Sequence, residues 1–122
     1  MDTFPETPAT IAPTGSLTDE QIAGLKVQFP RGVQELLVTT ATLEVVAGYI
    51  QKPNRNAVGI ALTKTTKGDV LGAGEFLLTN CLVGGDPRMN PNSAVADDDI
   101  IIAASLAMAK SVEVLDAEIK KL

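Results

Sequence analysis

The acidic residues of the chain include one group whose chemistry suits a hard cation such as Ca²⁺. Asp97, Asp98 and Asp99 are consecutive, and Asp86 lies upstream of them. An EF-hand loop also needs alternating ligands, a central glycine and a terminal glutamate, and this spacing lacks all three. Acidic residues are favoured in the first turn of a helix because of the helix dipole. The pattern therefore favours a helix start near Asp97, and we expect no metal site.

Two other groups have residue types that bind anions. Gly72 and Gly74 lack the third glycine of the dinucleotide pattern and the Gly-Lys-Thr of a P-loop, so small residues at a helix contact are the favoured interpretation. Lys52, Arg55 and Lys64 have no glycine-rich cradle beside them, which favours solvated surface over an anion site. We keep Lys52 and Arg55 as candidate residues for binding a partner protein.

The chain has no histidine, so the commonest general base near neutral pH and the commonest metal-binding side chain are both missing. Its one cysteine, Cys81, lies in an apolar stretch, where a lone cysteine usually behaves as a small buried hydrophobe. A disulfide framework is excluded. We expect no cofactor and no enzymatic activity. Hydrolysis by carboxylates alone is the remaining alternative.

Composition limits the other classes of function. A net charge of −5 and a pI of about 4.6, with Lys120 and Lys121 the only adjacent basic residues, argue against nucleic-acid binding. The 122 residues are enough for one core. No stretch approaches the ~20 apolar residues of a membrane helix, and the N-terminus does not resemble a signal peptide. We expect a protein that stays in a cytoplasm and binds neither nucleic acid nor membrane.

The chain divides into an arm, residues 1–16, and a single domain, residues 17–122. The arm is rich in Pro and Thr and has no helical or strand period. It is either a disordered tail or an extended arm that orders on a partner. The domain opens with a helix to about Phe29, because Thr18 and Gln21 match the capping box.

The rest of the domain predicts an α+β fold: a short β-hairpin or small antiparallel sheet packed with about four helices. The expected strands cover 33–38 and 43–50. Because a two-stranded sheet is marginal alone, it needs helices on one face or a third strand from a partner. Helices are expected at 55–66, at 70–81 with Val70, Ala73, Leu77 and Leu78 toward the core, and from Asp97 to the end. Turn residues predict a loop over 84–93.

The long C-terminal helix is expected to carry one continuous apolar stripe of residues spaced three and four apart: Ile101, Ala104, Met108, Val112, Leu115, Ile119 and Leu122. The other helices of so small a domain can cover only its first half. The uncovered end, Leu115, Ile119 and Leu122, is therefore a candidate interface. Tyr49, the only tyrosine, is a further candidate, although a core position at a strand end is the commoner role.

The order of elements resembles small proteins encoded in the structural gene clusters of tailed phages, often described as tail assembly chaperones. The resemblance covers about 17–122. It rests on the run 17–26, the Lys-Pro-x-Arg element within 49–55, and the Cys-Leu-Val-Gly-Gly-Asp element within 74–86. It implies a non-enzymatic protein of the host cytoplasm that assists tail assembly by binding a tail or other virion protein.

Two functions follow from the resemblance. A chaperone would shield a tail protein through its sheet edge or helical stripe, by strand addition or helix-in-groove binding. A structural virion subunit of the tail, neck or capsid would instead clamp a neighbour with its N-terminal arm, which the resemblance does not cover. The candidate partner-binding residues are Tyr49, Lys52, Arg55, Leu115, Ile119 and Leu122, and the partner is a virion protein or another copy of the chain.

Overall fold

The α+β fold is confirmed by the computed structural model, which describes residues 12–112 and 117–121. These contain four α-helices, one 3-10 helix and one three-stranded antiparallel sheet. In chain order the elements are α1 (Asp19–Gln28), β1 (Val33–Thr39), β2 (Val45–Gln51), α2 (Arg55–Thr66), α3 (Val70–Cys81), β3 (Leu82–Gly85), η2 (Pro87–Met89) and α4 (Asp98–Lys110).

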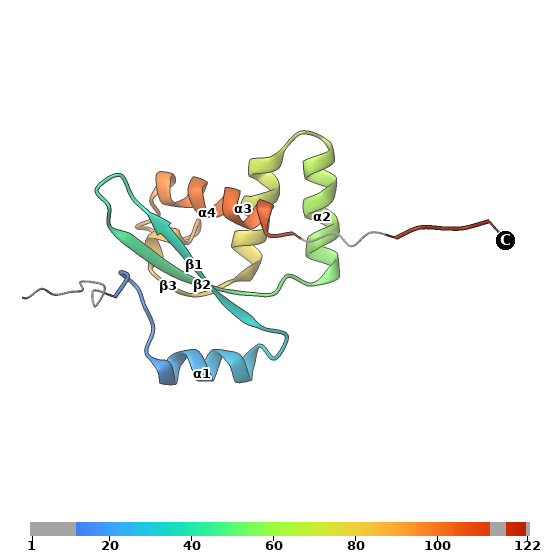
Figure 1. Cartoon of the computed structure of the whole chain (residues 1–122). Helices are drawn as coiled ribbons and strands as arrows, with labels where there is room; N and C mark the ends of the chain where they lie inside the picture. The colour runs from blue at the N-terminus through green and yellow to red at the C-terminus, as the bar shows by residue number, and fades with distance from the viewer. Residues whose placement is uncertain (1–11, 113–116, 122) are drawn as a thin grey trace, which may run out of the picture.

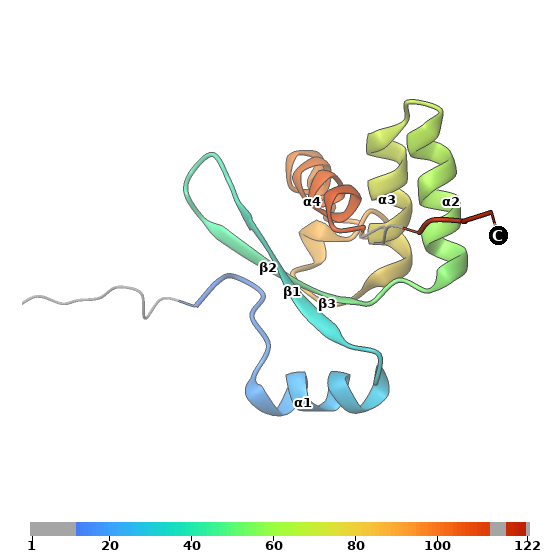
Figure 2. The same ribbon diagram turned by 45° about the vertical axis from the view of Figure 1, so that its right-hand side comes forward.

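The sheet has the strand order β1-β2-β3, so the central strand is β2. Helices α2, α3 and α4 lie on one side of the sheet and α1 lies on the other (Figures 1 and 2). The core lies between the sheet and the three helices, and its largest fully buried side chains include Val46, Leu77, Leu78, Met89 and Met108. The required cover for the hairpin is thus supplied by helices of the same chain.

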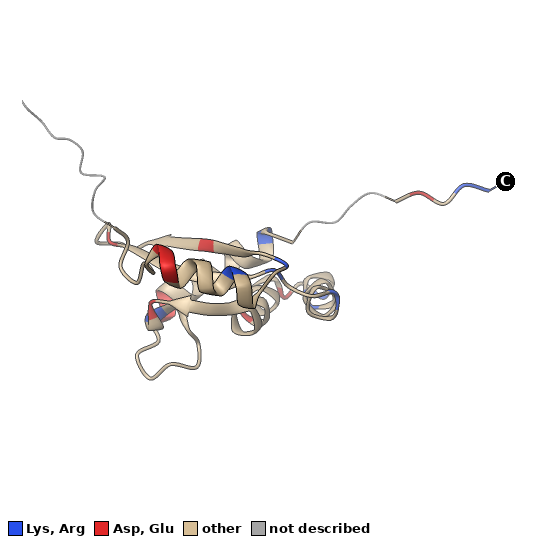
Figure 3. Ribbon diagram, turned by 90° about the horizontal axis from the view of Figure 1, so that it is seen from below, with Lys and Arg blue, Asp and Glu red and all other residues tan. Residues whose placement is uncertain are grey.

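Helix α1 starts where the capping box predicts. The Thr18 hydroxyl accepts from the Gln21 N–H at 3.2 Å, and the Gln21 side chain accepts from the Thr18 N–H at 2.9 Å. Its first turn is acidic and its last turn basic, as the helix dipole favours (Figure 3). None of its ten residues is buried. The helix is therefore stabilised by its caps and by its half-buried side chains rather than by burial in the main core.

Helices α2 and α3 have the predicted bounds and caps. Asn54 accepts from the Ala57 N–H at 2.8 Å, and Asp69 accepts from the Gly72 N–H at 2.9 Å. Ala73, Leu77 and Leu78 are buried as expected. Val70, the fourth residue expected to face the core, is 44% exposed, because it lies in the first turn of α3.

The predicted loop over 84–93 was partly wrong. Gly84 and Gly85 belong to β3, which pairs with β2 through Gly48↔Gly85 and Tyr49↔Gly84. A Cβ at Gly85 would meet the Ala47 carbonyl, and the residue has a φ of +108°. Gly85 allows the backbones of β3 and β2 to approach closely, and turn chemistry alone does not distinguish such a position from a loop.

The prediction that the last helix runs to the end of the chain was also wrong. Helix α4 ends at Lys110, where Ser111 caps it and the Ser111 hydroxyl donates to the Met108 carbonyl at 2.7 Å. Ile101, Ala104 and Met108 are buried, and Val112 packs against the core. Residues 117–121 are not helical. Within the described residues, the stripe is therefore packed as far as Val112 and is exposed at Ile119.

The end of the predicted arm is attached to the sheet. The Thr14 N–H donates to the Val45 carbonyl and the Ala47 N–H donates to the Thr14 carbonyl, both at 2.8 Å. Thr14 thus pairs with β2 on the same edge that β3 uses, and it forms a parallel bridge to Val46. Residues 1–11, the rest of the arm, lie outside the described residues.

Helices α3 and α4 are in close backbone contact where they cross at Gly74 and Ser105. A Cβ at Gly74 would collide with the Ser105 carbonyl, so only glycine fits at this position. Gly59, in α2, has open space where a Cβ would be. The small-residue interpretation of Gly74 is confirmed, since it lets two helix backbones approach.

We expect Gly74→Ala to lower the free energy of unfolding by about 1–3 kcal/mol, because α3 and α4 must separate to admit the methyl group. Gly59→Ala is the matched control and should raise stability by about 0.5–1 kcal/mol through helix propensity alone. Urea denaturation followed by circular dichroism measures both. Equal midpoints for the two variants would show that the crossing is looser than described.

Candidate functional site

A hollow of about 540 Å³ lies at the end of the sheet away from the hairpin turn. We call it the Lys52 hollow. It is formed by the start of β1, the end of β2, α2 and the residues after α4. Its lining combines five apolar residues with two cationic and three polar or glycine residues: Val33, Ile50, Pro53, Val58 and Val112, then Arg31, Lys52, Gly32, Gln34 and Ser111.

A smaller hollow of about 130 Å³ adjoins it and shares Arg31, Lys52 and Pro53. The Arg31 guanidinium donates to the Pro53 carbonyl at 3.1 Å, which holds the side chain between the two hollows. The smaller hollow is also lined by Asn54 and by Asn80 and Cys81, which come from the start of α2 and the end of α3.

The smaller hollow brings together two sequence elements that carry the phage resemblance. The Lys-Pro-x-Arg element contributes Lys52, Pro53 and Asn54, and the Cys-Leu-Val-Gly-Gly-Asp element contributes Cys81. No chemical role could be assigned to either element from the sequence. Their meeting at one surface gives them a common position, although Cys81 itself is 2% exposed and burial raises the pKa of its thiol.

The structure separates the candidate partner-binding residues. Lys52 lines both hollows, whereas Arg55 is exposed in the first turn of α2 outside their linings. Ile119 is fully exposed and lies in a non-helical segment. Leu115 and Leu122 lie outside the described residues, so the interface predicted on a continuous helix has no helix to support it at Ile119.

Tyr49 is a core residue, because its side chain is only 3% exposed. Its hydroxyl donates to Glu35 at 2.8 Å and accepts from the Leu17 N–H at 3.2 Å. Burial raises the pKa of Tyr49 above its ordinary value. The residue joins the start of α1 to β1 and β2, so a direct contact with a partner is not its role in this fold.

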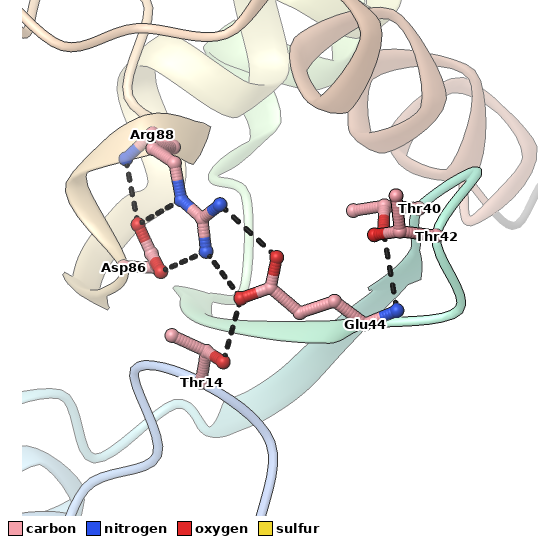
Figure 4. A network of polar contacts seen from close by, with 6 residues as sticks. All are labelled: Thr14, Thr40, Thr42, Glu44, Asp86 and Arg88. Atoms are coloured by element: carbon pink, nitrogen blue, oxygen red, sulfur yellow. Dashed lines mark hydrogen bonds and ion pairs between the residues drawn. The ribbon is translucent and has the colours of Figure 1, made fainter.

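A polar network at the other end of the sheet was missed by sequence reasoning (Figure 4). Arg88 binds two carboxylates in bidentate fashion: Glu44 at 2.8 and 3.2 Å, and Asp86 at 2.9 and 3.2 Å. Thr14 donates to the same Glu44 at 2.8 Å. We call these four residues the Arg88 clamp, and they join the arm, the start of β2 and η2.

The electrostatics of the clamp are those of a structural contact. The hydrogen bond from Arg88 is the main reason why the pKa values of Glu44 and Asp86 lie below their ordinary range, and Thr14 adds to the effect on Glu44. The two carboxylates hold the pKa of Arg88 above its ordinary value. Asp86 is buried, while Glu44 and Arg88 are about one-third exposed. The network is therefore ionised across the physiological range.

The acidic cluster serves the fold in the same way. Asp97 accepts from the N–H groups of Asp99 and Ile100 at 3.0 and 3.2 Å and so caps α4. Asp86 is engaged by Arg88. Among residues 12–112 and 117–121, no three His, Cys, Asp or Glu side chains are grouped so that they could hold a metal ion. The same part of the chain contains no helix that is both long and apolar enough to span a membrane.

Within the Arg88 clamp, only Asp86 and Arg88 are close in the sequence, two residues apart after a pair of glycines. Theirs is the one contact of the clamp that local sequence could have suggested. Glu44 lies 44 residues from Arg88, and nothing in the sequence connects them. Comparisons with protein-family models, with curated proteins and with solved structures find no match to this chain.

We expect stability to fall as the pH drops below about 5, because both carboxylates have lowered pKa values in the folded state. Their contribution is present above the pKa values of the unfolded chain and is lost as protons bind through the folded values. Asp86→Asn should flatten this dependence more than Glu44→Gln, since Asp86 is buried and Glu44 is screened by solvent.

Thermal unfolding between about pH 2 and pH 7 measures the effect, with Asp98→Asn as a control in an exposed helix start. An identical pH profile for the wild type and Asp86→Asn would mean that the clamp does not form in solution.

Proposed function

We propose that this chain is a non-enzymatic tail assembly protein of a tailed phage that acts in the host cytoplasm by binding a segment of another virion protein. The observation that carries the proposal is the meeting of the Lys-Pro-x-Arg element with Cys81 of the second element at the smaller hollow, which adjoins the Lys52 hollow. Lys52 and Asn54 are exposed there and Cys81 is buried, and we infer that this surface recognises a partner.

The chemistry of the Lys52 hollow supports a particular kind of segment. Valine, isoleucine and proline side chains offer apolar contact, and Arg31 and Lys52 place positive charge beside it. In a chain with a net charge of −5, this local positive charge favours an acidic segment. The proposed ligand is therefore an apolar stretch of a tail protein with an acidic residue next to it, held in a concave site.

We expect Lys52→Glu to weaken capture of the partner tail protein by at least about tenfold, because it reverses the charge beside the apolar lining. Lys26→Glu, in the exposed last turn of α1, is the matched control with the same charge change. The measurement is pairwise co-purification with each tail protein encoded beside this chain, followed by titration of any complex.

Both variants should retain native circular dichroism. A complex that forms equally well with wild type, Lys52→Glu and Lys26→Glu would place the binding surface elsewhere. Failure of every neighbouring tail protein to bind the wild type would remove the proposed function itself.

A structural virion subunit is the second candidate, and the attachment of Thr14 favours it. Thr14 is bonded to β2 and to Glu44, so the described end of the arm is fixed to the domain, as an arm that clamps a neighbour requires. Mass spectrometry of purified particles separates the two functions. A subunit is present in stoichiometric amount, whereas an assembly chaperone is depleted from the finished particle.

A further inference from the structure

The direction of each backbone group in β1 follows from the register of the hairpin. The Thr40 N–H donates to the Glu44 carbonyl at 2.8 Å, and the Lys52 N–H donates to the Gly32 carbonyl at 3.1 Å. These two bonds lie at opposite ends of the β1–β2 ladder. On the β1 side of the hairpin they involve Gly32 and Thr40, which are both even-numbered. Since alternate residues of an antiparallel strand bond to the same neighbour, Gln34, Leu36 and Val38 bond to β2.

The bonds on the far side of β2 confirm this alternation. Val45 and Ala47 accept from Thr14 and Asp86 on the side away from β1. Their partners across the hairpin are Thr39 and Leu37. The odd-numbered residues of β1, which are Val33, Glu35, Leu37 and Thr39, therefore direct their N–H and C=O groups outward.

The outward edge of β1 is unpaired within the described part of the chain. β1 is the end strand of the sheet, and none of the four odd-numbered residues makes a backbone hydrogen bond to a turn or loop there. The side chains of Glu35, Leu37 and Thr39 are exposed, with Leu37 at 49%. Such a row of free groups is a template for another strand.

We propose that β1 pairs antiparallel with β1 of a second copy, so that two sheets join into one of six strands. A two-fold axis at Leu36 uses all four outward residues of each copy, with Val33 opposite Thr39 and Glu35 opposite Leu37. Leu36 then lies opposite Leu36 of the second copy. Every outward N–H and C=O of both strands gains a partner in this register.

The two faces of the sheet suit a second copy as the occupant. Opposite residues of an antiparallel pair share a face, so the helix-covered face of one sheet continues into the helix-covered face of the other. The half-buried Leu36 side chains meet there. Moving the axis to Glu35 would instead oppose two glutamates, which is unfavourable, so the Leu36 register is selected.

The surface used borders the Lys52 hollow and shares Val33 with it, although the hollow itself is formed by a single copy. One pair of seven-residue strands is a small interface, and we expect an association that depends on concentration rather than a permanent dimer. Sedimentation of the full chain over about a thousandfold range of concentration should show monomer giving way to dimer.

Leu37→Glu should weaken this dimer by at least about tenfold, because Leu37 lies opposite Glu35 of the second copy in this register, so the change places like charges opposite each other at two positions of the seam. Val27→Glu is the control with the same charge change, since Val27 is exposed on α1 and away from the edge. A wild type that stays monomeric throughout, or a dimer equally affected by both variants, overturns the proposal.

Amide hydrogen exchange tests the register without any substitution. The N–H groups of Gln34, Leu36 and Val38 should be protected at every concentration, because they bond to β2. Those of Glu35, Leu37 and Thr39 should become protected only as dimer forms. Protection of the odd-numbered amides in the monomer would mean that the chain covers its own edge, and their free exchange in a dimer would mean that the copies meet elsewhere. Either result refutes the proposal.

Discussion

Hydrogen bonding along both edges of β2 is the constraint on which the rest of the fold depends. Val46, Ala47, Gly48, Tyr49 and Ile50 are all buried, so each of their backbone groups needs a partner inside the protein. β1 supplies those partners on one edge. β3 and Thr14 share the other edge between them, and Gly85 of β3 allows the close approach to β2.

The Arg88 clamp stabilises the edge of β2 that β3 and Thr14 share. β3 has only four residues and Thr14 forms a single bridge, so neither would hold β2 well alone. Arg88 joins both to the start of β2 through Asp86 and Glu44. Ion pairs at a surface contribute little individually, but here one guanidinium connects three segments that are distant in sequence. Its role is geometric, since it sets where the arm leaves the sheet.

The completed inner edge of the sheet determines where the two proposed binding surfaces lie. With β2 satisfied on both sides, the outer edge of β1 is the long sheet edge that remains in the described chain. The Lys52 hollow forms at the end of the same strands, where α2 and the residues after α4 diverge from the sheet. The proposed self-association at the edge and the proposed capture of a tail segment in the hollow use neighbouring groups and share Val33.

Local chemistry allowed the sequence alone to predict most of the secondary structure. The caps at Thr18, Asn54 and Asp69 need only residues three positions away, so α1, α2 and α3 begin where their sequences indicate. The hairpin and the α+β class follow from β-branched runs and apolar periodicity. The absence of histidine likewise removes whole classes of chemistry without any structure.

Contacts between distant segments were decided only by the tertiary structure. From the sequence, Gly84 and Gly85 predict a turn, and only their pairing with β2 in the folded chain shows that they belong to a strand. The apolar stripe continues past Met108 in the sequence, but α4 ends at Lys110, where Ser111 caps it and its hydroxyl donates to the Met108 carbonyl. Tyr49 is buried by the start of α1, and Arg88 finds Glu44 only across the fold. The apolar pattern of the sequence predicts which faces of a helix or strand can be buried. Whether such a face is buried depends on which other segments of the chain pack against it.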